Sequence, residues 1–194
     1  NLKKAIAQAK AHGFLGKNVL GSGVDIELEL FDGHGSYVAG EETAMLESMQ
    51  GRPAMPRQKP PFYPTDFGLY GKPTLVNNVE TLCNIPRMLH KGAGWFTQIG
   101  TEKCPGTMMF SLSGSVNRPG VYEMPMGVTI REMVEESGGG VPGGRKIKAV
   151  FPGGPAFPMV TADQLDLTMD FDSLKKAGTG LGSAGMIVVD DATC

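Results

Sequence analysis

Apolar and polar residues alternate regularly in the first quarter of the chain, and the period of this alternation differs between two segments. The first segment has helical spacing and is followed by His12-Gly13, a typical helix stop, so we expect a helix ending near Ala11. From Val24 to Leu30 every second residue is apolar and the intervening residues are acidic. This period of two predicts a half-exposed strand.

The helical period returns after Glu42, where Met45, Leu46 and Met49 share one face and Gly51 marks the end. A long segment rich in proline and aromatic residues follows, from Arg52 to Pro73. Loops of this length are uncommon in compact domains and are often functional, and proline stiffens them at low entropic cost. Two interpretations stay open, a loop that holds a ligand and a surface arm that wraps the domain.

The next helix is predicted to begin at the pair Asn77-Asn78, because asparagine is a favoured capping residue. Its apolar positions are Val79, Leu82, Ile85 and Leu89. One asparagine caps the helix, which leaves the other and Thr81 as possible ligand donors. Pro86 is expected to kink this helix or mark its restart, and Cys83, on the helix, is expected to be a buried apolar residue.

The second half of the chain has the pattern of a small α+β domain. A hairpin is predicted from strands at 108–112 and 121–124, joined by the turn Asn117-Arg118-Pro119-Gly120. Thr129 and Glu132 form a capping box before a short helix with Ile130, Met133 and Val134 facing inward. Further strands are expected at 148–151 and 185–189, which together predict a fold of the β-grasp kind. No acid–base pair accompanies these elements, which favours a scaffold or docking module over a reaction centre.

Composition narrows the function without naming it. The chain has 194 residues and a formal net charge of −2, enough for one domain or two small ones and with no basic footprint for nucleic acid. No apolar run is long enough to span a membrane. The three cysteines are far apart, which indicates a reducing compartment, and the dispersed histidines argue against a self-contained metal site. The first residue, Asn1, lies inside a helical pattern and the chain stops at Asp190–Cys194, just after an apolar strand, so we expect a piece of a longer protein.

The most informative segment is Gly33–Thr43, a glycine-containing turn between the predicted strand and the helix after Glu42. Backbone N–H groups at such a turn can meet a phosphate or a flavin ring. The adjacent carboxylates Glu41 and Glu42 would repel a bare anion, so a ligand with both anionic and hydrogen-bond-donating parts is indicated, such as a flavin or dinucleotide. The alternative is that both acids simply favour the positive end of a helix.

Four motifs in order carry a family resemblance: residues 37–43 (YVAGEET), 57–62 (RQKPPF), 76–81 (VNNVET) and 113–123 (SGSVNRPGVYE). Together they resemble the NADH-binding flavoprotein subunit of respiratory complex I, a family that includes the diaphorase subunits of NAD-linked hydrogenases and formate dehydrogenases. The resemblance implies an α/β fold followed by α+β: the C-terminal part of a Rossmann-like FMN-binding domain, then a soluble-ligand-binding β-grasp (SLBB) domain. We place these domains at residues 1–105 and 106–194.

The resemblance also implies a set of cofactor-binding residues and no catalytic acid, base or metal ligand. Glu41 and Glu42 would lie beside the isoalloxazine and nicotinamide, Lys59 would contact NADH, and Phe62 would stack on adenine. The remaining residues would hold FMN: Tyr37 and Gly40 at the flavin, and Asn77, Asn78 and Thr81 at the ribityl chain and phosphate. Two structural alternatives remain, in which Phe62 plugs a core and Lys59 is a solvated side chain.

The activity so implied is hydride transfer from NADH to FMN, which needs close stacking and no protein acid or base. Single electrons would then leave toward iron–sulfur clusters whose ligands lie outside this chain, so we expect the isolated segment to be inactive. Implied partners are a small ferredoxin-like iron–sulfur subunit and a large iron–sulfur subunit, in the cytoplasmic peripheral arm of a complex at the inner face of a bacterial membrane, without membrane insertion.

Two other functions are open: a hydrogenase or formate dehydrogenase diaphorase, and a non-catalytic β-grasp docking module. The chain departs from the family at Ala39, where a cysteine is often found. This change is expected to affect flavin tuning or oxidant sensitivity more than binding.

Overall fold

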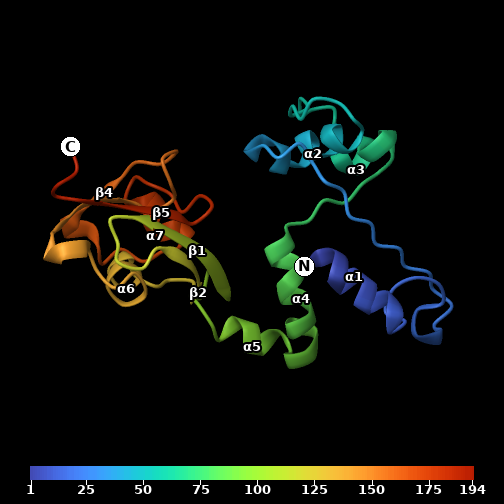
Figure 1. Cartoon of the computed structure of the whole chain (residues 1–194), viewed down its shortest axis with the longest axis horizontal. Coiled ribbons are helices and arrows are strands. Elements are labelled where there is room, and N and C mark those ends of the chain that lie inside the picture. Colours follow the sequence, from blue (N-terminus) through green and yellow to red (C-terminus); the bar gives the residue numbers. More distant parts are fainter. The chain divides into compact units, whose positions relative to one another are not determined.

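The computed structural model describes residues 1–194, which divide into two compact units, Asn1–Asn77 and Asn78–Cys194 (Figure 1). Each unit is described by itself. None of the helices is both long and apolar enough to cross a membrane.

The first unit contains short helices joined by extended chain and holds no multi-stranded sheet. Its helical elements are α1 (Leu2–Ala11), η1 (Val19–Gly21), η2 (Tyr37–Gly40), α2 (Glu42–Met49), α3 (Pro64–Phe67) and η3 (Leu69–Gly71). The two helices predicted from apolar spacing are confirmed as α1 and α2. On α2 Leu46 is buried as expected, whereas Met45 and Met49 are half-buried.

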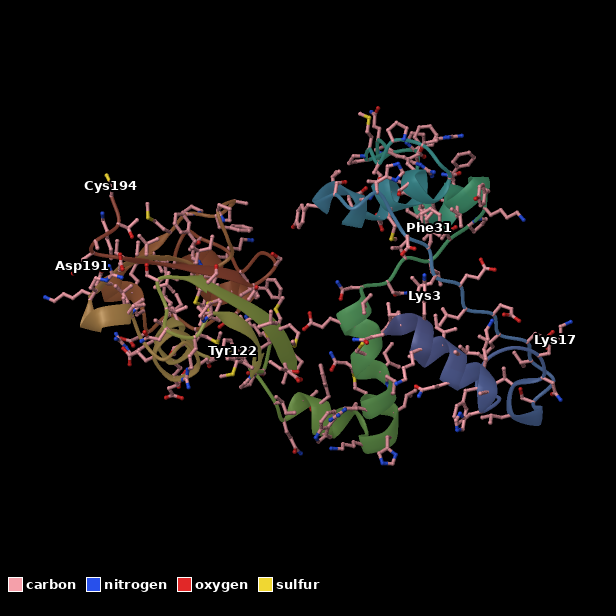
Figure 2. All side chains as sticks on the ribbon, viewed as in Figure 1. Lys3, Lys17, Phe31, Tyr122, Asp191 and Cys194 are labelled. Carbon is pink, nitrogen blue, oxygen red and sulfur yellow. The ribbon has the colours of Figure 1, made fainter.

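The strand predicted at Val24–Leu30 is wrong. The segment is extended but pairs only through an isolated bridge, in which Gly16 and Ile26 exchange N–H···O bonds of 2.7 and 2.9 Å. A strand needs a neighbour to take up its backbone donors and acceptors, and no strand of this unit lies beside this segment. Its apolar side chains therefore stay exposed, from 39% at Leu30 to 54% at Val24. Figure 2 shows Phe31 projecting from this run of extended chain.

The second unit is an α+β domain built on one mixed sheet. Its strands are β1 (Thr107–Gly114), β2 (Gly120–Pro125), β3 (Ile147–Phe151), β4 (Val160–Thr161) and β5 (Gly185–Asp190), in the order β2-β1-β5-β3-β4. The pair β1–β5 is parallel and the other three pairs are antiparallel. Its helical elements are α4 (Val79–Lys91), α5 (Ala93–Thr97), α6 (Ile130–Glu132), η4 (Met133–Ser137), η5 (Pro142–Gly144), η6 (Ala162–Gln164) and α7 (Phe171–Lys176).

The predicted hairpin and capping box are both confirmed in this unit. Antiparallel β1 and β2 form the hairpin. The hydroxyl of Thr129 accepts from the Glu132 N–H at 3.1 Å, and the Glu132 carboxylate accepts from the Thr129 N–H at 2.8 Å. The residues predicted to face inward from the helix, Ile130, Met133 and Val134, are fully buried. They join one core cluster with the inward residues of the sheet.

Helix α4 begins as predicted but is more exposed than expected. It runs through Pro86 to Lys91, so Pro86 does not end it, and none of its residues is buried. Cys83 is exposed, which makes the prediction of a buried cysteine wrong. The reason is that the unit covers α4 incompletely: its apolar positions Leu82 and Ile85 are 48% and 39% exposed, and Val79 and Leu89 are 73% and 82% exposed.

The division into compact units falls between Asn77 and Asn78 and groups α4 and α5 with the sheet. One contact that binds α4 to the sheet is direct: the Glu80 carboxylate accepts from the Met109 N–H of β1 at 2.8 Å. The predicted domain boundary between residues 105 and 106 remains a prediction.

Candidate functional site

The two adjacent acids at the start of α2 have different roles. Glu41 caps the helix: its Oε2 accepts from the N–H groups of Thr43 and Ala44 at 2.9 and 2.8 Å. The same oxygen accepts from the Thr43 hydroxyl at 2.5 Å. Burial alone would raise the pKa of Glu41, but the bonds from Thr43, Ala44 and Lys59 outweigh it and lower the pKa. The sequence-based alternative of an acid favoured by the helix terminus therefore describes Glu41 well.

Glu42 has no such capping role, and its partner is Lys59. The Lys59 ammonium donates to Glu42 Oε1 and also lies 3.3 Å from Glu41 Oε1. The hydrogen bond to Glu42 is the main reason why the pKa of Lys59 is raised. One cation thus bridges two carboxylates and leaves the cluster with a net charge of about −1 at neutral pH. This excludes the interpretation of Lys59 as a free solvated side chain.

Phe62, from the proline-rich loop, is half-exposed and contacts another aromatic ring. Its centroid lies 5.9 Å from that of Phe67 at an interplanar angle of 56°. With 41% of Phe62 exposed, it is not a core plug, and its predicted stacking on a planar ligand remains a prediction. Phe62, Phe67 and Tyr70 line an open pocket of about 980 Å³ formed by the loop and the end of α2.

Tyr37 and Gly40 leave the surface beside the acids open. The Tyr37 side chain is 94% exposed. A Cβ added to Gly40 would meet no atom within 4 Å, so nothing in the chain fills that space. An exposed aromatic ring and a bare backbone next to carboxylates leave room for a flat ring with polar edges, and the assignment of this surface to FMN remains a prediction.

The predicted ribityl and phosphate ligands lie around the first turn of α4. Asn78 caps the helix through Oδ1, which accepts from the N–H groups of Glu80 and Thr81 at 2.8 and 3.3 Å. Its amide NH₂ remains available as a donor. Asn77 and Thr81 are exposed, and their side chains make no hydrogen bond within the chain. The Asn77 amide, the Asn78 NH₂ and the Thr81 hydroxyl are thus free for hydroxyl or phosphate groups, and their role as ligands remains a prediction. Asn78 and Thr81 belong to the second unit, and the other predicted site residues belong to the first.

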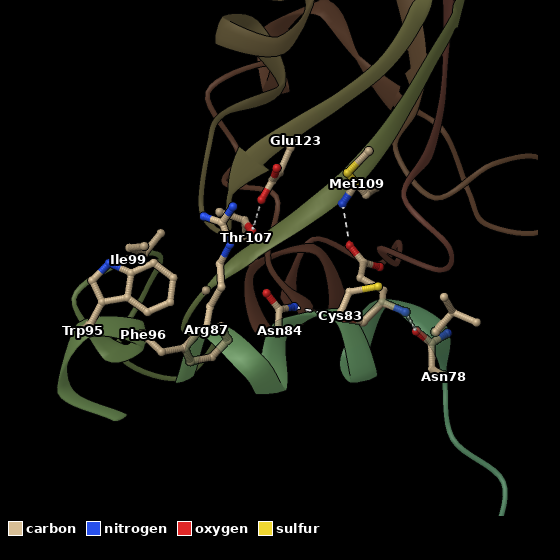
Figure 3. Close-up of a pocket in the computed structure, with 13 residues that line it drawn as sticks. Asn78, Cys83, Asn84, Arg87, Trp95, Phe96, Ile99, Thr107, Met109 and Glu123 are labelled. Carbon is tan, nitrogen blue, oxygen red and sulfur yellow. Dashed lines mark hydrogen bonds between the residues drawn. The ribbon is translucent and has the colours of Figure 1, made fainter. Parts of the chain in front are cut away.

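The second unit has a pocket that the sequence did not suggest. Figure 3 shows it between α4, α5 and the β1–β2 hairpin, with a volume of about 710 Å³. Cys83, Arg87, Trp95 and Glu123 are among its lining residues. Glu123 accepts from the Thr107 hydroxyl at 2.8 Å across the hairpin.

Two domain families match successive parts of the chain, and the first match extends past the division between the two compact units. Residues 1–87 match the family described as "Nuo51 FMN-binding domain", and residues 109–184 match "SLBB domain". The molecule is therefore a segment of a flavin-binding domain joined to an SLBB domain, which confirms the predicted fold classes.

Relatives are similar over the whole chain. The second F subunit of the NADH-quinone oxidoreductase of Rhizobium meliloti (strain 1021) is 51% identical over 193 residues, which are 100% of this chain and 46% of that protein. The corresponding F subunit of Rickettsia felis is 47% identical over 194 residues, again 100% of this chain and 46% of that protein. The F subunit of Mycobacterium tuberculosis (strain ATCC 25618 / H37Rv) is 46% identical over 193 residues, 100% of this chain and 43% of that protein.

A solved structure is similar as well. The crystal structure of NAD⁺-reducing [NiFe]-hydrogenase in the H₂-reduced state has a TM-score of 0.75 and 35% identity, covering 87% of this chain and 28% of that one. The chain is similar over its whole length to part of the NADH-quinone oxidoreductase F subunits. It spans about half the length of the curated relatives it matches, 46% of the first two.

Sequence reasoning missed the contacts that hold the proline-rich loop against α2. Arg57 donates to Glu47 of α2, and Tyr70 N–H donates to Gln50 Oε1 at 3.0 Å. Arg57 was visible only as part of the motif that contains Lys59 and Phe62. The one sequence signal of a partner for Arg57 was the acidic residue Glu47 on α2.

Proposed function

We propose that the full-length protein containing this chain oxidises NADH at a bound FMN, as the electron-input subunit of an NADH:quinone oxidoreductase. The observation that carries the proposal is the cluster of Glu41, Glu42 and Lys59 beside an open glycine turn, within a segment that matches an FMN-binding domain. When bound, FMN supplies the chemistry, accepting two electrons as hydride and releasing them singly. Iron–sulfur clusters outside this chain would receive the electrons.

The residues of this chain bind and orient. Phe62 offers a ring face to adenine from a proline-stiffened loop, so little ordering entropy is lost on binding. Glu42 accepts hydrogen bonds from a hydroxyl or amide of the nucleotide, and Lys59 donates to one of its oxygens. Tyr37 and Gly40 border the flavin ring. Asn77, Asn78 and Thr81 hold the ribityl chain and phosphate through amide and hydroxyl groups. No proton has to be moved by a side chain, since hydride transfer depends on the distance between two stacked rings.

The proposal is tested with the full-length protein reconstituted with FMN, by following NADH oxidation with ferricyanide as acceptor. Phe62→Ala is expected to weaken NADH binding by about 1–3 kcal/mol, the range for base–aromatic stacking. Phe14→Ala is a suitable control, because Phe14 is also exposed (55%) but lies outside the proposed site. Unchanged NADH affinity in Phe62→Ala would remove the stacking role.

Glu42→Gln tests the acidic pair, because it keeps the shape of the side chain and removes its charge. We expect altered nucleotide affinity with retained flavin, whereas Glu29→Gln, on the exposed extended segment, should change neither. A wild-type protein that takes up no flavin and does not oxidise NADH would refute the proposal as a whole.

A second candidate is the diaphorase subunit of an NAD-linked hydrogenase or formate dehydrogenase. The similarity to the NAD⁺-reducing [NiFe]-hydrogenase supports it, with 35% identity and a TM-score of 0.75. Both candidates use the same flavin site, so purification of the natural complex and identification of its subunits would separate them. A small ferredoxin-like and a large iron–sulfur subunit are expected in either case, and a cytoplasmic peripheral arm at the membrane only with complex I.

A third candidate is a non-catalytic docking module built on the β-grasp fold. The core of the second unit favours a stable scaffold, but the bridged cluster of Glu41, Glu42 and Lys59 favours a binding site in the first unit. Flavin titration discriminates the two, since a docking module would bind none.

A further inference from the structure

We infer that Arg57 and Thr43 are positioning residues that place Lys59 between Glu41 and Glu42, and so set the affinity of this site for NADH. The expected effect on NADH affinity rests on the proposed function. The positioning contacts themselves do not depend on that proposal.

Arg57 ties the proline-rich loop to two other segments. Its Nε donates to Glu47 Oε1 at 2.6 Å, and its Nη1 donates to the carbonyl oxygens of Phe67 and Gly68 at 2.7 and 3.2 Å. The planar guanidinium can make these bonds at the same time because its donors form a rigid fork. Arg57 therefore joins α2 to the end of α3, two residues before Lys59 along the chain.

Thr43 connects the backbone of Arg57 to the acidic pair. Its hydroxyl accepts from the Arg57 N–H at 2.8 Å and donates its proton to Glu41 Oε2 at 2.5 Å. Because Oε2 of Glu41 is engaged by Thr43 and Ala44, the other oxygen faces Lys59. The route from Arg57 through Thr43 to Glu41 thus holds one of the two carboxylates and the backbone two residues before Lys59.

The contact between Arg57 and Glu47 is strengthened because both side chains are largely buried. The side chains of Arg57 and Glu47 are only 11% and 13% exposed, so water competes weakly for their hydrogen bonds. Without these hydrogen bonds, no contact of Arg57 would offset the conformational entropy lost when the loop between α2 and Lys59 is ordered. The lowered pKa of Glu41 and the raised pKa of Lys59 both favour the charged forms of these two groups in this arrangement.

Arg52 provides a matched comparison on the same acid. Its Nη1 lies 3.5 Å from Glu47 Oε2, and its side chain is 66% exposed. It donates to no carbonyl oxygen through its side chain, and its backbone N–H bonds to Glu47 O at 2.9 Å, not to Thr43. Arg52 therefore has the same charge as Arg57 and pairs with the same acid, but it lacks the contacts with Thr43 and with carbonyl oxygens that would position Lys59.

The test is steady-state NADH oxidation by the FMN-loaded full-length protein, with flavin content and Tm measured for each variant. Arg57→Gln is expected to raise KM for NADH about tenfold, the loss of one to two charge-assisted hydrogen bonds, with a smaller change in kcat. Arg52→Gln should stay within about twofold of wild type. In a Lys59→Met background, adding Arg57→Gln should change KM by less than about twofold, because the residue it positions is already gone.

Thr43 supplies a second pair of variants should Arg57→Gln fail to fold. Thr43→Val removes the hydroxyl at nearly equal volume and should raise KM severalfold, and Thr43→Ser should restore it. The inference would be overturned if the effects of Arg57→Gln and Lys59→Met on KM multiplied in the double variant. Equal KM values for Thr43→Val and Thr43→Ser would overturn it as well.

A readout without NADH separates this inference from the proposed function. Reductive methylation followed by peptide mass analysis reports the free amine of each lysine. Lys59 in wild type should react slowly relative to exposed Lys72, and Thr43→Val should accelerate Lys59 severalfold while Thr43→Ser does not. Equal Lys59 reactivity in all three proteins refutes the positioning role, even where NADH oxidation is confirmed. If the protein does not oxidise NADH but shows the difference in Lys59 reactivity, the proposed function is refuted and the positioning role is not.

Discussion

The two units of this chain are stabilised in different ways. In the second unit, seventeen buried side chains form one core cluster beneath a mixed sheet. In the first unit, only Ala44 and Leu46 are buried hydrophobic residues, and the loop is held to α2 through polar contacts of Arg57, Thr43 and Gln50. Sixteen large hydrophobic residues of that unit, from Leu2 to Leu75, are exposed.

The difference follows from what each sequence can bury by itself. The alternation at Val24–Leu30 has no sheet beside it in its unit, so its apolar side is left to solvent. In the second unit β1 lies between β2 and β5, and Phe110 and Leu112 are covered on both sides. A ligand-binding surface built on polar contacts is consistent with the low packing of the first unit, because binding loops tend to come from the less stable parts of a protein.

The largest expected contrast is in amide hydrogen exchange. In the 194-residue chain, amides of Val24–Leu30 should exchange close to the rate of unfolded peptide, apart from those of the Gly16–Ile26 bridge. Amides of β1 and β5 should be slower by several orders of magnitude, since they open only with the global unfolding of the core. Measured by mass spectrometry, equal protection of both segments would break the comparison.

A core truncation should destabilise the second unit strongly. Phe110 is 0% exposed in the centre of the sheet, so Phe110→Ala should lower the free energy of unfolding by about 3–5 kcal/mol. Val121→Ala, at a site 61% exposed on β2, should change it by less than about 0.5 kcal/mol. Urea denaturation of both variants provides the measurement, and similar losses at the two sites would contradict a single core.

The smallest effect is that of a helix cap, and it depends on pH. Asp170 caps α7, and bonds from Thr168 and Ser173 outweigh burial, which by itself would raise its pKa, so that the pKa of Asp170 is lowered. A lowered folded-state pKa adds stability that is present above the unfolded value of about 3.9 and is lost as pH falls through the folded value.

Asp170→Asn keeps a capping oxygen but replaces Oδ2, which accepts from the Thr168 and Ser173 hydroxyls, by an NH₂ donor. It should therefore cost about 1 kcal/mol at neutral pH, and less as the solution is acidified below about pH 4. Asp172, whose side chain is 51% exposed, is the control, and Asp172→Asn should show little loss at any pH. The comparison is made by urea unfolding across pH. A constant difference between wild type and Asp170→Asn down to about pH 2 would refute the role of the charge.

Signals contained within a few residues were predicted well. A cap at the Asn77-Asn78 pair, the cap at Thr129 and the hairpin turn at Asn117–Gly120 all depend on local backbone chemistry. All are found in the structure, where Asn78 is the capping member of the pair. Helix α7 was missed, although Asp170 before Phe171 is itself a capping signal. The two-residue strand β4 was also missed, because a strand this short has no period to detect.

Much of the candidate site could be predicted from motifs, but not how its parts are held. Glu41, Glu42, Lys59 and Phe62 were all predicted as cofactor-binding residues, and that role remains a prediction. The bridging of Glu41 and Glu42 by Lys59 depends on contacts across seventeen or more residues. No local pattern contains such contacts, and the same holds for Arg57 with Glu47.

The sequence by itself determined where α2, α4 and α6 begin, where the hairpin turns, and which motifs resemble a flavin-binding family. These properties follow from periodicity, caps and residue types that act over a few positions. The tertiary structure alone decided the strand order, the exposure of Val24–Leu30 and α4, and the placement of Lys59 between two carboxylates. Strand order and burial depend on which distant segments share hydrogen bonds and apolar surface, and a local pattern does not specify its distant partner.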